Sequence, residues 1–93
     1  MEIKKGMNSF YVGDSEENPK AQMEYKLLGE DVVEIHHTEV SQELQGEGVG
    51  KELLSELVDW ARTENMKILP SCPYAEKQLK KNPEYDNMIY KDN

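Results

Sequence analysis

Three segments in the first half of the chain have the pattern of β-strands. In the clearest, from Ala21 to Leu27, apolar side chains alternate with polar ones, which is the period of a strand with one buried face. Short polar turns separate the segments, so we expect an antiparallel opening of strand, turn, strand, turn, strand. The predicted strands are residues 9–13, 21–27 and 32–40, and the predicted turns are residues 14–20 and 29–31.

The second half begins with a helical pattern. Apolar residues recur on one helical face between Val49 and Ala61, and polar residues fill the other face, which predicts an amphipathic helix over residues 48–65. Leu54 and Leu57 should be buried against the sheet. A fourth strand should follow, parallel to the third because a helix joins the two. The remaining predictions are this strand at residues 67–71, a helix at residues 73–81, and either a helical turn or an edge strand at residues 85–90.

A glycine-rich turn lies between the third predicted strand and the long helix. Gly46, Gly48 and Gly50 alternate there, and bare backbone at a helix N-terminus is a typical cradle for phosphate groups. Glycine permits close approach and a positive φ. Neither the Walker pattern nor the dinucleotide fingerprint fits this register. The pattern that fits is Gln45-x-x-Gly48-x-Gly50, which resembles the coenzyme A (CoA) loop of the GNAT superfamily of acyl-CoA N-acyltransferases.

Other segments extend the resemblance over roughly residues 20–90. The sequences His-Thr-Glu-Val at residues 37–40, Ser-Cys-Pro-Tyr at 71–74 and Asn-Pro-Glu-Tyr at 82–85 resemble a small, single-domain GNAT-like subfamily. The resemblance implies one domain over residues 1–93 with a reduced GNAT-like α/β fold: a mixed, mainly antiparallel sheet with about two helices. Full-length GNAT domains have two helices between their first strands, where they wall the acceptor pocket. Here a polar turn occupies that place.

The same resemblance implies that acetyl-CoA or CoA binds at the loop. In GNAT proteins the pantetheine arm pairs with backbone of the strand before the loop, here at Thr38 and Val40. Lys51 either contacts a phosphate or is a solvated side chain at the start of the helix. The expected cofactor-binding residues are Thr38, Val40, Gln45, Gly46, Glu47, Gly48, Val49, Gly50 and Lys51.

Three residues are candidates for the chemistry. Cys72 follows the fourth strand, where the thioester should arrive, and is expected outside the closed core; it could accept the acetyl group or protonate the leaving thiolate, or it is a small buried hydrophobe. Tyr74 lies in the region where GNAT enzymes place a proton-donating tyrosine, or it is a half-buried aromatic anchor. His37 is expected on the face of Val33 and Ile35, as a general base or as a histidine hydrogen-bonded in the sheet.

Composition restricts the partners. The chain has 93 residues, one cysteine and a net charge of −8, and such acidity argues against nucleic-acid binding. An acidic rim would attract a cationic amine, although acidic balance often only keeps a protein soluble. No apolar run reaches membrane-spanning length, adjacent histidines diverge too much to share a metal, and a lone cysteine fits a reducing compartment. We therefore expect a cytoplasmic monomer with no metal and no membrane contact.

The sequence thus predicts a minimal N-acetyltransferase that transfers the acetyl group from acetyl-CoA to an unidentified amine. The sequence permits two mechanisms: direct attack by the amine, and passage of the acetyl group through Cys72. Two other classes stay open: a CoA-binding module without catalysis, and a protein-interaction domain that reuses the fold.

Overall fold

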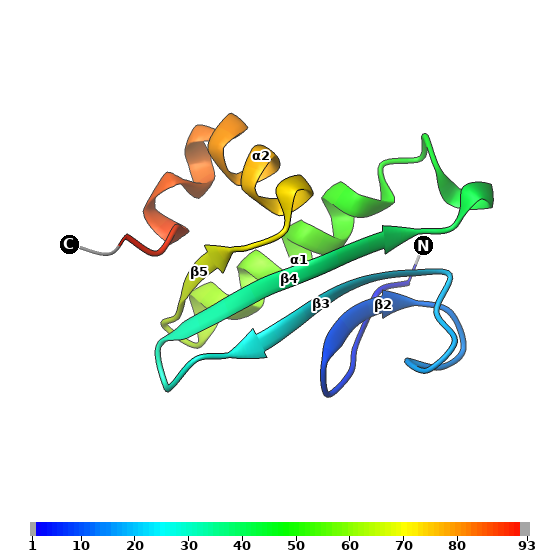
Figure 1. Cartoon of the computed structure of the whole chain (residues 1–93), viewed down its shortest axis with the longest axis horizontal. Coiled ribbons are helices and arrows are strands. Elements are labelled where there is room, and N and C mark those ends of the chain that lie inside the picture. The colour runs from blue at the N-terminus through cyan, green and yellow to red at the C-terminus, as the bar shows by residue number, and fades with distance from the viewer. Residues whose placement is uncertain (1, 92–93) are drawn as a thin grey trace.

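Five strands pair side by side in the order that they have along the chain (Figure 1). The computed structural model describes residues 2–91. The three pairings among the first four strands are antiparallel, and the fifth strand pairs parallel with the fourth. The predicted mixed, mainly antiparallel α/β sheet is therefore confirmed. The strands are β1 (Lys4–Lys5), β2 (Ser9–Val12), β3 (Ala21–Leu27), β4 (Val32–Val40) and β5 (Lys67–Pro70).

A β-bulge interrupts β4 in its middle. Tyr25 pairs with Ile35 but Glu24 pairs with His37, so His36 is an extra residue without a partner. An inserted residue reverses the alternation of faces beyond it. His37 therefore shares a face with half-buried Glu24, whereas Thr38 pairs with fully buried Met23. The prediction that His37 lies on the face of Val33 and Ile35 is wrong, because strict alternation does not anticipate a bulge.

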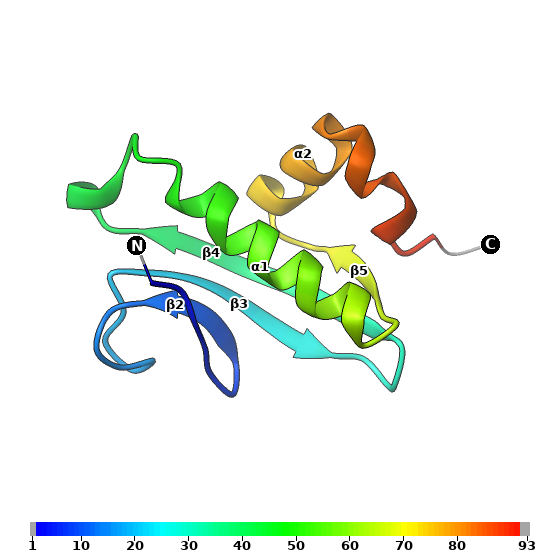
Figure 2. The ribbon, with the colours of Figure 1, turned by 180° about the vertical axis from the view of Figure 1, so that it is seen from behind.

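The long helix α1 (Val49–Thr63) covers one face of the sheet, as the view from behind shows (Figure 2). Its apolar stripe packs on β2, β3, β4 and β5. Leu54 and Leu57 are 1% and 0% exposed, which confirms the predicted buried face. Among residues 2–91, no helix combines the length and apolar character that a crossing of the bilayer requires.

A second helix, α2 (Pro73–Lys81), follows β5 and contacts both β5 and β4; in Figure 1 it lies near the end of β5. Pro73 occupies its first turn, as predicted, because proline has no N–H to lose there. A 3-10 helix, η2 (Pro83–Met88), comes next, and Ile89 then forms a single parallel bridge with Ile68. The segment at residues 85–90 therefore combines both of the alternatives that the sequence left open.

Two short elements were not predicted. The 3-10 helix η1 (Gln42–Leu44) bridges β4 to the glycine-rich turn. The two-residue β1 is too short to show a periodic pattern, and Lys5 holds it in place: its Nζ lies 4.8 Å from the centre of the Trp60 ring. That cation–π contact links the edge strand to an aromatic cluster of Phe10, Tyr25 and Trp60.

Candidate functional site

A groove of about 430 Å³ opens between the C-terminal half of β4, the first turn of α1 and the inner face of α2. Apolar side chains form much of its wall, and the glycine-rich turn forms one end. The lining residues are Thr38, Val40, Leu44, Gln45, Gly46, Gly48, Val49, Gly50, Lys51, Tyr74 and Gln78.

The separation of β4 from β5 creates the groove. The two strands pair only as far as Ile35 and Pro70. Beyond that point the carbonyl of Ile35 accepts bonds from the N–H groups of both Ser71 and Cys72, at 3.0 and 3.1 Å, and the chain turns into α2. Within the described residues, the part of β4 after the bulge pairs with β3 on one edge only. Its other edge can pair with an extended ligand.

Two of the three glycines in the turn are required by backbone conformation. Gly46 has a φ of 85° and Gly48 a φ of 76°, and a β-carbon on either would meet no atom within 4 Å. Non-glycine residues rarely adopt this left-handed region. Gly48 caps α1, so N–H groups of the first helical turn, which lack partners within the helix, lie beside it. The Gln45 side-chain amide closes the turn by donating to the Val40 carbonyl, at 3.4 Å.

Gly50 is required for a different reason. It lies inside α1, and a β-carbon built there would be 2.6 Å from the Tyr74 hydroxyl oxygen. The first turn of α1 and the first turn of α2 thus meet through one tyrosine. Burial raises the pKa of the Tyr74 hydroxyl, and the neighbouring Cys72 adds to the rise. The hydroxyl therefore keeps its proton at neutral pH and can donate a hydrogen bond into the groove.

Cys72 lies one layer behind the groove. Its side chain is 6% exposed and belongs to the hydrophobic core, so the expectation of a thiol outside the closed core is wrong. The thiol instead bonds with the Thr38 hydroxyl, with 3.3 Å between Sγ and Oγ1. Thr38 lines the groove and separates Cys72 from it. The bulge explains this arrangement, because it turns Thr38 toward the buried face and thereby toward Cys72.

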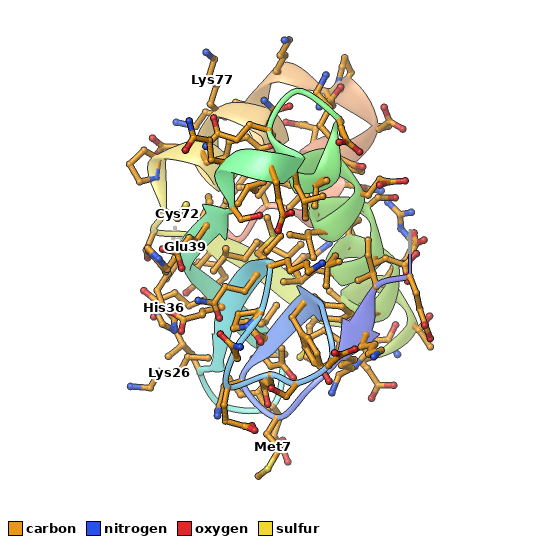
Figure 3. All side chains as sticks on the ribbon, turned by 90° about the vertical axis from the view of Figure 1, so that its right-hand side faces the viewer. Met7, Lys26, His36, Glu39, Cys72 and Lys77 are labelled. Atoms are coloured by element: carbon orange, nitrogen blue, oxygen red, sulfur yellow. The ribbon has the colours of Figure 1, made fainter. Side chains whose placement is uncertain are left out.

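The other predicted residues divide between the groove and the outer surface. Eight of the nine expected cofactor-binding residues line the groove; Glu47 is exposed and does not. His37 lies with Glu24 on the sheet face away from α1. His36 is on that face too, with its Nδ1 4.0 Å from a Glu24 oxygen. In Figure 3, Lys26, His36 and Glu39 extend on the side opposite α1.

Sequence reasoning missed several polar and apolar residues near the strand separation. Gln78 and Leu44 line the groove; Gln78 is four residues after Tyr74, a spacing that places both on one helical face. On the outer face, Ser71 donates from its hydroxyl to the Glu34 carboxylate at the point where β4 and β5 part. Within residues 2–91, His, Cys, Asp and Glu form no group that could hold a metal ion.

This geometry suits an elongated ligand with one anionic end. The N-terminus of α1, the left-handed glycines and Lys51 lie at one end of the groove and suit an anion. The free edge of β4 and the apolar wall can then hold an extended arm.

Comparison with known proteins gives the same architecture. Residues 9–88 match the sequence model of a family described as GCN5-related N-acetyl-transferase. The solution structure of a GCN5-like protein from Staphylococcus aureus is 42% identical, with a TM-score of 0.81 over 99% of this chain and 90% of that one. The crystal structure of Tetrahymena GCN5 shares the fold at 16% identity, with a TM-score of 0.62 over 91% of this chain and 61% of that one.

Curated relatives match over a shorter stretch. The protein NATD1 of chicken and mouse is 33% identical over 64 residues, which is 69% of this chain. The matched segment spans 58% of the length of those relatives.

Proposed function

The chain belongs to the GCN5-related N-acetyltransferase family, and from that premise we propose that it binds acetyl-CoA in the groove and transfers the acetyl group to an amine. One observation carries the proposal. The groove joins a glycine turn at the N-terminus of α1 to the free edge of β4, so one ligand can reach both. A pyrophosphate suits the first feature, and a pantetheine arm, which has amides along an extended chain, suits the second.

The residues of the groove have distinct roles in this proposal. Gly46, Gly48 and Lys51 hold the pyrophosphate, and the backbone of Thr38 and Val40 pairs with the arm. When bound, acetyl-CoA supplies an acetyl group activated as a thioester. The neutral Tyr74 hydroxyl donates a hydrogen bond or a proton at the inner part of the groove, because its raised pKa keeps it protonated.

Proton acceptors for the amine lie on the outer face of the sheet. The Glu34 carboxylate, held by Ser71, and the His37 imidazole both flank the region where β4 leaves β5. An amine that approaches from this face would meet either group before it reached the strand separation. The two residues can be tested separately with Glu34→Gln and His37→Gln. Substitution of the residue that acts as the base should abolish the rise of the transfer rate with pH.

A route through an acetylated Cys72 is the second mechanism. It requires Thr38 to move, because the thiol faces Thr38 and not the groove. Mass spectrometry after incubation with acetyl-CoA tests it: the protein should gain the mass of one acetyl group, and Cys72→Ser should not. If the wild-type mass stays unchanged while an amine is acetylated, direct transfer is the mechanism.

A CoA-binding module without catalysis is the alternative that the structure favours most. The burial of Cys72 and the loop at residues 14–20, in place of helices that would wall an acceptor, both support it. Release of free CoA thiol in the presence of a panel of amines separates the two functions. Binding of acetyl-CoA without any thiol release would identify the module.

Gly48→Asp tests the binding site itself. The substitution puts a side chain on backbone that has a positive φ and brings a negative charge close to the pyrophosphate. The affinity for acetyl-CoA, measured by calorimetry, should therefore fall more than about tenfold. Gly29→Asp is the matched control, since Gly29 also has positive φ and open space around it but lies in the β3–β4 turn. Equal binding by both folded variants would contradict the proposed site.

A further inference from the structure

Gln78 is the buried polar side chain of the groove wall. On the basis of the proposed acetyl-CoA binding, we propose that its side-chain amide recognises an amide of the pantetheine arm. The inference gives α2 a part in ligand recognition, in addition to the glycine turn and the β4 edge.

The surroundings of Gln78 favour a ligand contact over a structural role. The residue is 8% exposed and lines the groove. Its backbone carbonyl accepts a bond from the Asn82 side chain, at 2.7 Å. Its side-chain amide has no hydrogen-bond partner within residues 2–91, and yet it is not an orphaned buried group as Ser41 Oγ is. The amide is therefore accessible to water, and the residue lines the groove.

The energetics of burial point the same way. A carboxamide has two N–H donors and an acceptor oxygen, and a ligand that displaces water from them without supplying partners leaves them unpaired at a cost. The neighbouring positions Ala75 and Leu79 are 0% and 1% exposed, so α2 is already anchored by apolar side chains. A leucine or methionine at residue 78 would extend that packing at no such cost. A glutamine is favourable there if a ligand supplies its partners.

The chemistry of the wall narrows the partner to an amide-bearing arm. Val40, Leu44 and Val49 surround the groove with apolar surface, which would suit any alkyl chain. A purely alkyl arm should bind more weakly, because it would leave the Gln78 amide unpaired. An arm that offers both a donor and an acceptor should bind more tightly. A pantetheine amide between the β4 edge and Gln78 could bond to both walls.

Two ligands and one substitution test the inference. Calorimetry should compare acetyl-CoA with adenosine 3′,5′-bisphosphate, which has the phosphates but no arm. Gln78→Met should weaken acetyl-CoA binding about tenfold, the loss expected for one hydrogen bond, and leave bisphosphate binding unchanged. Lys77→Met is the control, because Lys77 is exposed on the same helix and extends away from the sheet (Figure 3); it should bind both ligands like the wild type.

The melting temperature of the free protein supplies a second readout. Since the Gln78 side-chain amide makes no hydrogen bond within residues 2–91, Gln78→Met should melt no lower than the wild type. If the glutamine had a structural role, the variant would melt at a lower temperature. If Gln78→Met does not fold, Gln78→Glu keeps the length and polarity but loses the donors, and it should show the same selective loss.

Three results would overturn the inference. Equal losses for acetyl-CoA and the bisphosphate would mean that Gln78 supports the glycine turn. No loss for either ligand would mean that the arm does not contact it. Failure of the wild type to bind acetyl-CoA would refute the proposed function, and this inference with it.

Discussion

At the scale of single residues, the contact between Gly50 and Tyr74 joins the two helices beside the groove. Alanine is normally more stable than glycine inside a helix by about 0.5–1 kcal/mol. Gly50→Ala should not show this gain, because the new methyl group would displace the tyrosine ring. In a Tyr74→Ala background, the same substitution should stabilise the protein by about that amount. Urea unfolding of the four variants measures this coupling, and strictly additive effects would contradict the contact.

Glu16 is a second residue with a measurable effect. Its carboxylate accepts bonds from the N–H groups of Asn8 and Met7 and from the Ser9 hydroxyl, at 2.9, 3.1 and 2.8 Å. The Asn8 bond is the main cause that lowers the pKa of Glu16 below its ordinary value of 4.5. The carboxylate thus fastens the loop at residues 14–20 onto the β1–β2 turn.

A lowered folded-state pKa gives stability that is present above the unfolded pKa and is lost as pH falls through the folded pKa. Glu16→Gln should therefore lower the melting temperature at pH 7. The difference from the wild type should shrink as the pH falls below about 4.5, the ordinary carboxyl value. Thermal melts over this range, with exposed Glu56→Gln as the control, measure the effect; a difference independent of pH would exclude this role for Glu16.

At the scale of elements, the bulge in β4 directly follows Ile35, the last residue that pairs with β5, so we expect the bulge to open the groove. Deletion of His36 would restore strict alternation and leave Thr38 and Val40 on their present face, since the bulge contributes one unpaired residue. We expect the variant to fold, because every buried position is kept. A straight β4 should remain beside β5 beyond Ile35, and acetyl-CoA binding should be lost. Circular dichroism and calorimetry together test this, and undiminished binding would show that the bulge does not open the groove.

Helix α1 is the element on which the core depends. Leu57→Ala removes a fully buried side chain from its inner face and should cost about 2–5 kcal/mol of unfolding free energy. So large a loss would leave a small domain barely folded. Exposed Glu56→Ala on the same helix is the control. Equal urea midpoints for the two variants would mean that the apolar face has been wrongly assigned.

At the scale of the whole molecule, the protein is acidic and the proposed ligand is an anion. The net charge is −8, and exposed Glu43, Glu47 and Glu52 surround the glycine turn while Lys51 alone of the groove residues is cationic. Long-range repulsion should slow association, and salt should relieve it. The association rate of acetyl-CoA in stopped flow should therefore rise with ionic strength. Uncharged pantetheine should show no such rise, and a fall for acetyl-CoA would indicate attractive steering.

Local patterns predicted most of the fold. β4 was predicted at residues 32–40 and α2 at residues 73–81, each with the bounds that the structure has, because alternation, helical spacing and Pro73 act over a few neighbouring residues. The glycine turn was recognisable for the same reason. β1 and η1 are two and three residues long, too short for any pattern to repeat, so no local signal marks them.

The tertiary structure decided what the site contains. The bulge at His36 depends on the pairing of β3 with β4, and it moved His37 to the outer face and Thr38 toward Cys72. The burial of Cys72 and the place of Gln78 in the groove wall depend on how α2 packs beside the end of β4. The sequence by itself determined the longer elements and the glycine turn, since these arise from neighbouring residues. Which side chains meet around the groove arises from contacts between distant segments, and only the packed fold specifies those.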